Sequence, residues 1–331
     1  SVSFINNLSL TLISIFGSLL YLVGSVSLGN LSSFVLYSRK FSGPVNEMAN
    51  IISELQSAAA AAERVFRMID EPAEAADLPQ AKPLEEVKGD VQMKDIQFGY
   101  EPDKVIIHDL NLHAKPGSLV AIVGPTGAGK TTIINLLMRL YEKDAGSIRI
   151  NGQEVSSIPP HELHTKFEVV FQNDVLFADT VRENIDFGRN LPQQRIEQAA
   201  VSAQAMEFID TLPERFEHMV TARGTNLSGG QKQRVLLSRA LAGNSEILIL
   251  DDSSSALDYK TDSQLRSALR EQYSDITTIV IAQRVSSILH ADHILVLDEG
   301  KEIGYGTHEQ LMESCAVYRE ISESQMGGDF G

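Results

Sequence analysis

Tryptophan is absent from this sequence, and cysteine occurs only once, at Cys315. A single cysteine excludes a disulfide within the chain and is typical of a protein in a reducing compartment. Proline, with 11 residues, and glycine, with 23, are too few for a collagen-like or low-complexity chain. Lysine and arginine (28) are outnumbered by aspartate and glutamate (44), so the net charge is −16. Such a surface repels phosphate backbones, and nucleic acid is therefore not expected as a partner.

Charge is missing altogether from the first 38 of the 331 residues. Residues 4–23 contain no charged side chain and are close to the ~20 residues that a helix needs to cross a hydrocarbon core. Gly24, Gly29 and Asn30 then end the run. We predict a membrane helix here; the alternative is a buried helix of a soluble protein. A signal peptide is not indicated, because a basic leading region and a small-residue cleavage site are both lacking. The chain begins at Ser1 instead of Met, so we expect a fragment whose earlier part is missing.

A second helical segment is predicted over residues 31–69, with Gly43-Pro44 as its only interruption. At 1.5 Å per residue it would extend roughly 58 Å, which is more than a bilayer requires, so it should continue beyond the membrane. Arg39 and Lys40 lie early in this segment. They either face a polar cavity, a partner or an interface, or extend to water, and the sequence leaves both readings open.

An acidic linker with several prolines follows, from Asp70 through Pro79 to Pro83. From Val91 onward, short apolar runs alternate with helical patterns. This alternation is typical of an α/β domain.

The clearest motif joins an apolar run, residues 118–123, to a helical pattern over residues 133–140. Between them the sequence reads G-x-x-x-x-G-K-T, in the strand–loop–helix setting that a phosphate-binding loop requires. Its glycines allow backbone N–H groups to point at phosphate oxygens, Lys130 adds a point charge, and Thr131 offers a hydroxyl to Mg²⁺. The segment, called the phosphate loop below, consists of Gly124, Pro125, Thr126, Gly127, Ala128, Gly129, Lys130, Thr131 and Thr132.

Two further motifs become informative once the phosphate loop is recognised. The apolar run 246–250 ends in Asp251, where a carboxylate at the end of a strand can lie near the metal of a nucleotide site. Residues 227–231 (LSGGQ) lead into a helical pattern over residues 232–242. Ser228 and the two glycines suit an anion site at a helix start, and they equally suit an ordinary N-capped helix.

These motifs, in this order, resemble the ATP-binding-cassette (ABC) superfamily and specifically its exporters. The segment 227–231 matches that family's LSGGQ signature, and Ser255–Asp258 matches its D-loop at the dimer interface. The resemblance implies that ATP and Mg²⁺ bind, that Gln172 reaches the metal after the strand 167–171, and that Tyr100 stacks on adenine. Without the resemblance, Gln172 would be a surface glutamine and Tyr100 an aromatic residue at a strand edge.

The resemblance covers almost the whole chain and implies an α/β P-loop NTPase fold with an antiparallel nucleotide-contacting sheet, preceded by an all-α transmembrane segment. Residues 1–70 would be the last two membrane helices, 71–90 the linker, 91–325 the nucleotide-binding domain with a helical subdomain over residues 173–225, and 326–331 a tail. The implied nucleotide contacts are Tyr100, the phosphate loop, Ser228, Gly229, Gly230, Gln231 and Asp258. The implied metal contacts are Thr131, Gln172 and Asp251, and the implied catalytic positions are Asp252, Gln283 and Gln172.

Two residues depart from the family pattern at the catalytic positions. Hydrolysing members carry Glu after the strand-end Asp, and here the residue is Asp252. Loss of one methylene retracts the carboxylate by about an ångström, and a misplacement of ~1 Å can cost ~10²-fold in rate. Gln283 stands where the family has a switch histidine, and its amide can donate a hydrogen bond but carries no charge. Ala222 replaces a glutamate that exporters often carry before Arg223-Gly224, which puts cross-talk with the membrane domain in doubt.

Together, these departures resemble the degenerate half of a heterodimeric exporter. We therefore expect an ATP hydrolase coupled to transport whose own site hydrolyses poorly, in a bacterial plasma membrane with the nucleotide-binding domain in the cytoplasm. The expected partners are a second half-transporter chain, the lipid bilayer and a transported small molecule, lipid or peptide. The alternatives are a slow homodimer, a structural subunit that binds ATP without turnover, and a soluble regulatory P-loop ATPase.

Overall fold

The computed structural model describes residues 2–71, 88–253 and 255–326, so most of the predicted linker and nearly all of the tail lie outside the described residues. The chain divides into two compact units, Ser1–Ala76 and Asp77–Gly331. Each unit is described by itself.

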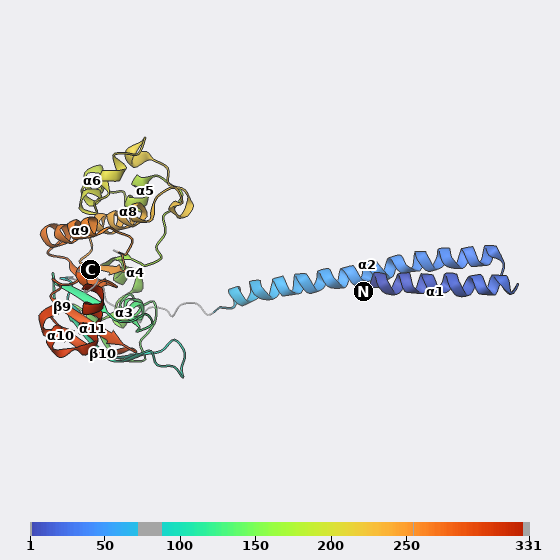
Figure 1. Cartoon of the computed structure of the whole chain (residues 1–331), viewed down its shortest axis with the longest axis horizontal. Coiled ribbons are helices and arrows are strands. Elements are labelled where there is room, and N and C mark those ends of the chain that lie inside the picture. The colour runs from blue at the N-terminus through green and yellow to red at the C-terminus, as the bar shows by residue number, and fades with distance from the viewer. Residues whose placement is uncertain (1, 72–87, 254, 327–331) are drawn as a thin grey trace. The chain divides into compact units, whose positions relative to one another are not determined.

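The first unit is a pair of helices, α1 (Val2–Leu22) and α2 (Leu28–Ile69), and Figure 1 shows α1 beside the first part of α2. The side chain of Ser27 caps α2 by accepting a hydrogen bond of 3.2 Å from the Asn30 N–H. Because of this cap, Gly29 and Asn30 lie in the first turn of the helix, whereas we had expected them in the break between the helices. A side chain at Gly17 would collide with Leu31, so this glycine lets the two helices approach closely.

The membrane assignment of residues 1–70 stays a prediction. Across the part of the chain that the structure describes, no helix combines the length and the apolar character that a membrane crossing requires. Arg39 and Lys40 are exposed in this unit, as are the apolar side chains of Phe16, Phe34 and Phe41. The predicted long second helix is confirmed, and it continues through Pro44.

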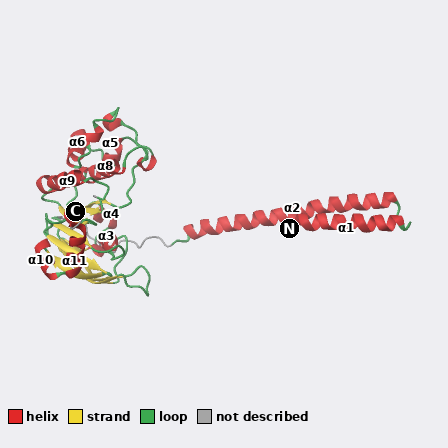
Figure 2. Cartoon of the chain, in the orientation of Figure 1, coloured by secondary structure: helices red, strands yellow, loops and turns green. Residues whose placement is uncertain are grey.

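The second unit is built on one mixed sheet of ten strands (Figure 2). In the order in which they lie side by side, the strands are β5 (Gln153–Glu154), β4 (Ala145–Ile150), β1 (Val91–Phe98), β2 (Ile107–Ala114), β10 (Lys301–Gly306), β9 (His293–Asp298), β3 (Leu119–Val123), β8 (Thr277–Ile281), β7 (Ile247–Asp251) and β6 (Phe167–Val170).

The sheet has a parallel half and an antiparallel half. β6, β7, β8, β3 and β9 pair in parallel, with Val170 opposite Leu250 and Asp251 opposite Ile281. β2, β1, β4 and β5 pair antiparallel. The α/β fold with an antiparallel part is therefore as predicted, and it brings the carboxyl ends of β3, β6, β7 and β8 to one edge of the sheet.

Helices cover the sheet and form a separate helical part (Figures 1 and 2). The α-helices of this unit are α3 (Lys130–Leu137), α4 (Pro160–His164), α5 (Val181–Asp186), α6 (Gln193–Ser202), α7 (Met206–Ile209), α8 (Gly229–Ala242), α9 (Tyr259–Gln272), α10 (His308–Ser314) and α11 (Ala316–Met326). The 3₁₀ helices are η1 (Val155–Ser157), η2 (Arg215–Glu217), η3 (Ala222–Gly224) and η4 (Val285–Ser287).

Three apolar clusters hold these layers together. The first packs α3 and the antiparallel strands on one side of the parallel strands, with Ile122 and Ile133 among its fully buried members. The second joins the helical part to β6 and β7 through residues such as Val235. The third packs α10 and α11 against β3, β9 and η4 around the fully buried Tyr318. The strand ends that carry the predicted site are thus supported on all sides by packed side chains.

Candidate functional site

The phosphate loop lies between β3 and α3, with glycines where the backbone needs them. Gly127 and Gly129 have φ of +85° and +98°, conformations that side chains strongly disfavour. A Cβ on Gly124 would collide with the carbonyl oxygen of Leu297, whereas a Cβ on Gly127 would meet no atom within 4 Å. Gly124 therefore allows close packing on the neighbouring strand, and Gly127 leaves the outer side of the loop open to a ligand.

Lys130 begins α3 and turns its ammonium group into the loop. Its Nζ donates to the carbonyl oxygens of Gly124, at 2.8 Å, and Pro125, at 2.7 Å. Burial lowers the pKa of this lysine, and the nearby Asp251 and Asp252 act in the opposite direction. The positive charge of Lys130 therefore lies close to the place where an anion would bind to the backbone N–H groups of the loop. α3 begins at Lys130 and not at residue 133 as predicted, so the loop leads directly into the helix.

Asp251 is the last residue of β7 and is almost fully buried. Its Oδ2 accepts a hydrogen bond of 3.3 Å from the Thr131 hydroxyl. Burial raises the pKa of the Asp251 carboxyl, and the Thr131 bond opposes that rise. The structure thus brings together two of the three residues that we predicted as ligands of a metal.

Asp252 follows at the turn beyond β7, with a positive φ of +51°. Its Oδ2 accepts hydrogen bonds from Nε2 of Gln283, at 2.7 Å, and from Nε2 of Gln172, at 3.3 Å. We call these three residues the Asp252 cluster. The residues follow β7, β8 and β6, three adjacent parallel strands, which explains how positions far apart in the sequence meet.

The contacts of Gln172 differ from the predicted ones. We expected its side chain to reach the metal beside Asp251, and in this structure its amide contacts Asp252. The pKa of the Asp252 carboxyl is raised by burial, although the Gln172 bond favours the charged form. Two amide donors thus occupy one oxygen of a largely buried carboxylate.

Tyr100 lies just beyond β1, beside the phosphate loop. Its hydroxyl is 3.2 Å from the Thr132 hydroxyl and accepts a hydrogen bond of 3.1 Å from the Asn135 amide. The Tyr100 ring packs edge-on against Phe98 and Tyr141, each at 4.9 Å between ring centroids, and it is 44% exposed. Sequence reasoning missed Asn135 and Tyr141, because neither belongs to a motif; their only signal is their closeness to the loop helix.

The signature segment forms the start of α8. Ser228 is the N-cap: its Oγ accepts from the Gln231 N–H at 3.3 Å, and the Gln231 side chain accepts from the Ser228 N–H at 2.9 Å. This reciprocal capping box starts α8 at Gly229, three residues before the predicted start. A Cβ on Gly229 would meet nothing within 4 Å, and one on Gly230 would be 3.2 Å from the Ala256 carbonyl oxygen. The N-cap reading is therefore correct, and the segment still presents an open helix start.

The D-loop residue Asp258 is also an N-cap. Its exposed carboxylate accepts hydrogen bonds from the backbone N–H and the hydroxyl of Thr261, at 3.0 and 2.8 Å, and these bonds lower its pKa. Arg284, next to Gln283, donates to the carbonyl oxygens of Ser255 and Leu257 at 3.2 and 3.5 Å. The D-loop is therefore tied to the loop that carries Gln283.

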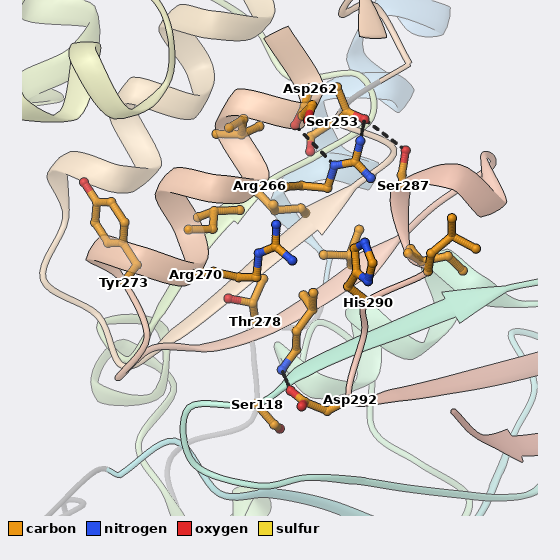
Figure 3. Close-up of a pocket in the computed structure, with 18 of the residues that line it drawn as sticks. Ser118, Ser253, Asp262, Arg266, Arg270, Tyr273, Thr278, Ser287, His290 and Asp292 are labelled. Carbon is orange, nitrogen blue, oxygen red and sulfur yellow. Dashed lines mark hydrogen bonds and ion pairs between the residues drawn. The ribbon is translucent and has the colours of Figure 1, made fainter. Parts of the chain in front are cut away.

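A cavity of about 340 Å³ lies between α9 and the parallel strands, and Figure 3 shows the residues that line it. Ser253, which follows Asp252, and Ser287 of η4 line it, and no residue of the phosphate loop does. Arg266 and Asp262 form an ion pair of 2.9 Å on its wall. Among its lining residues, Ser253 is the one that adjoins the Asp252 cluster in the sequence.

The residues at the loop fit a magnesium ion that also binds phosphate. Mg²⁺ prefers oxygen ligands and is usually held by one or two carboxylates together with substrate phosphates. Thr131 and Asp251 supply a hydroxyl and a carboxylate within 3.3 Å of each other. Among the described residues, no group of three or more His, Cys, Asp or Glu could hold a metal alone. Phosphate oxygens would therefore have to complete the ligand set.

Comparison with known proteins agrees with this geometry. Residues 107–255 match the model of the ABC transporter family. The fatty acid ABC transporter ATP-binding/permease protein of Mycobacterium tuberculosis is 38% identical over 326 residues, which are 98% of this chain and 51% of the relative. The ATP-dependent lipid A-core flippase of Saccharophagus degradans is 39% identical over 293 residues, 88% of this chain and 50% of that protein.

A solved structure of a bacterial Atm1-family ABC exporter with ATP bound superposes with a TM-score of 0.76 at 37% identity, covering 91% of this chain and 53% of that one. The chain thus spans about half the length of the relatives that it matches. The predicted resemblance is confirmed for the P-loop fold and the ATP-binding domain. Residues 107–255 thus form an ATP-binding domain of the ABC transporter type.

Proposed function

We propose that this chain is the ATP-binding and ATP-hydrolysing subunit of an ABC exporter. The observation that carries this proposal is the position of Lys130 inside the phosphate loop, with Thr131 bonded to Asp251 beside it. Lys130 would pair with the β- and γ-phosphates, the loop N–H groups would hold their oxygens, and the half-exposed Tyr100 ring would stack on adenine. Thr131, Asp251 and Gln172 would hold Mg²⁺, which neutralises phosphate charge when bound.

We further infer that this chain's own site turns over slowly. A general base must reach the attacking water, and the Asp252 carboxylate is short and already accepts two amide hydrogen bonds. Gln283 can donate to a γ-phosphate but brings no charge to it. The site would therefore hold ATP well and position water badly.

Such a site suits the degenerate half of a heterodimer. In this arrangement Gly229, Gly230 and Ser228 would face a γ-phosphate on the partner chain, and Asp258 would lie at the interface between the two. The side-chain hydrogen bonds described for residues 227–231 stay within residues 228–234, so none of them is made to this chain's own phosphate loop. A slow homodimer is the second candidate. Each chain would then lend its intact signature to the other, and the two sites would be equal.

Export would use the helices α1 and α2 as part of a larger membrane domain. The uncharged sequence of the first 38 residues supports contact with a lipid bilayer, and the Mycobacterium tuberculosis relative is named as an ATP-binding/permease protein. Of the classes expected, small molecule, lipid or peptide, a lipid is favoured because two relatives are named for fatty acid and lipid A-core. A soluble regulatory ATPase would not need an uncharged N-terminal segment.

Replacement of the loop lysine, Lys130→Ala, is expected to reduce Mg-ATP binding by the purified chain to background, because the only point charge inside the loop is lost. Equilibrium binding of a fluorescent ATP analogue measures this effect. Lys260→Ala, at an exposed position of α9, is the matched control and should bind normally. Wild-type affinity in Lys130→Ala would mean that the phosphate site is elsewhere.

Ser228→Arg is expected to collapse ATP hydrolysis by the assembled transporter, since the arginine would block the partner's γ-phosphate. Lys130→Ala should reduce hydrolysis less, because it affects the slower site. Steady-state phosphate release compares the two variants, with Gln198→Arg on the exposed side of α6 as control. Equal losses would contradict the heterodimer and favour two equivalent sites.

The double substitution Asp252→Glu with Gln283→His is expected to speed hydrolysis at this chain's site about tenfold, which corresponds to ~1.4 kcal/mol of barrier. The longer carboxylate would reach the water, and the imidazole would contact the γ-phosphate. Phosphate release is measured in a pair whose partner's catalytic glutamate is replaced by Gln, with both single variants beside the double. An unchanged rate would mean that these two side chains do not limit the site.

A further inference from the structure

The last turn of α11 forms a two-point contact with the loop that carries Gln283. Nε2 of Gln325 donates to the Gln283 carbonyl oxygen at 2.7 Å, and Oε1 of the same amide accepts from the Val285 N–H at 2.7 Å. Arg284, between these two positions, has an extended backbone with φ of −104° and ψ of 120°. The Gln325 carboxamide thus pairs with the loop as a neighbouring strand would.

This contact fixes the residue that holds the Asp252 carboxylate. Gln283 takes part in both interactions: its carbonyl oxygen accepts from Gln325, and its side chain donates to Asp252 at 2.7 Å. Gln283 itself is exposed and lies beyond the end of β8, so the strand ladder does not fix it. The Gln325 bonds restrain its backbone directly, in addition to the side-chain bonds of Arg284.

α11 is anchored without Gln325. Tyr318 is fully buried and packs with Val285 and Ile288, and Ile321 is partly buried in the same cluster. On its other side, η4 is held from α9: Arg266 donates to the Ser286 carbonyl oxygen at 2.6 Å. Figure 3 shows Arg266 beside Asp262, which also accepts a hydrogen bond of 3.2 Å from the Ser287 hydroxyl. Removal of the exposed Gln325 side chain should therefore loosen the loop and leave the fold intact.

We propose that Gln325 is a positioning residue for this chain's ATP site, which links the C-terminal helix to the Asp252 cluster through the backbone of Gln283. The proposal rests on the proposed function, because it takes the Asp252 cluster as part of a hydrolysing site. Through this link, a displacement of α11 changes the position of the Gln283 amide against Asp252. α11 thereby helps to position the side chains of the site, although it belongs to no sequence motif.

The first test measures the contact itself, in the full chain without nucleotide. In Gln325→Ala, amide hydrogen exchange at Val285 should speed up, since its N–H loses its acceptor. Gln325→Glu keeps an acceptor for Val285 and should exchange almost as slowly as the wild type. Glu323→Ala, two residues earlier on the same helix and exposed, should leave exchange unchanged. Equal exchange at Val285 in Gln325→Ala and the wild type would overturn the proposal.

The second test measures hydrolysis at this site in the assembled transporter. After Mg-ATP is loaded and free nucleotide removed, the slow decay of retained ATP reports this chain's site. Gln325→Ala should speed that decay about threefold to tenfold, the effect of about one lost net hydrogen bond, because the Gln283 amide then restrains the Asp252 carboxylate less. The amount of ATP retained should not change. Gln325→Glu, which cannot donate to Gln283, should fall between the two, and Glu323→Ala should match the wild type.

A positioning role also predicts coupling. In a Gln283→Ala background, Gln325→Ala should change the decay by less than about twofold, because the side chain that it positions is gone. Full additivity of the two substitutions, or an unchanged decay in Gln325→Ala, would overturn the role of Gln325. If the unsubstituted chain retained no ATP at all, both the proposed function and the positioning role would be wrong, whereas retained ATP with unchanged decay would contradict Gln325 alone.

Discussion

Parallel pairing of β6, β7, β8 and β3 is the constraint on which the site depends. Side chains that lie beyond the carboxyl ends of parallel strands meet at one edge of a sheet. Here that edge collects the phosphate loop after β3, Gln283 after β8, Asp251 and Asp252 at β7, and Gln172 after β6. A one-residue slip of β7 would exchange the faces of its side chains and separate the carboxylates from the loop.

At this edge the two adjacent carboxylates have different neighbours, which set them apart chemically. Asp251 contacts the Thr131 hydroxyl beside the loop, whereas Asp252 accepts from two amides. Burial raises the pKa of both. The first carboxylate is therefore available to a metal, and the second is restrained by the loops on either side of it. The arrangement is well suited to hold a nucleotide and poorly suited to activate water.

The phosphate loop and Asp251 could be predicted from the sequence, because their residue types and spacing are specific to such a site. The start of α8 was predicted too late, since the capping box between Ser228 and Gln231 overrides the low helix propensity of two glycines. The contact of Gln172 with Asp252 could not be predicted, because it depends on the turn that Asp252 makes beyond its strand. The contact of Gln325 with the Gln283 loop could not be predicted for a similar reason: it exists only because α11 packs against η4.

We propose that this chain binds ATP at its own phosphate loop and hydrolyses it slowly. The most direct measurement loads the assembled transporter with radiolabelled Mg-ATP, removes free nucleotide, and identifies the nucleotide that stays bound through Lys130, with Lys130→Ala as the blank. We expect ATP itself to persist at this site long after steady-state turnover of the transporter has consumed many equivalents. Bound ADP that forms as fast as overall turnover would contradict it.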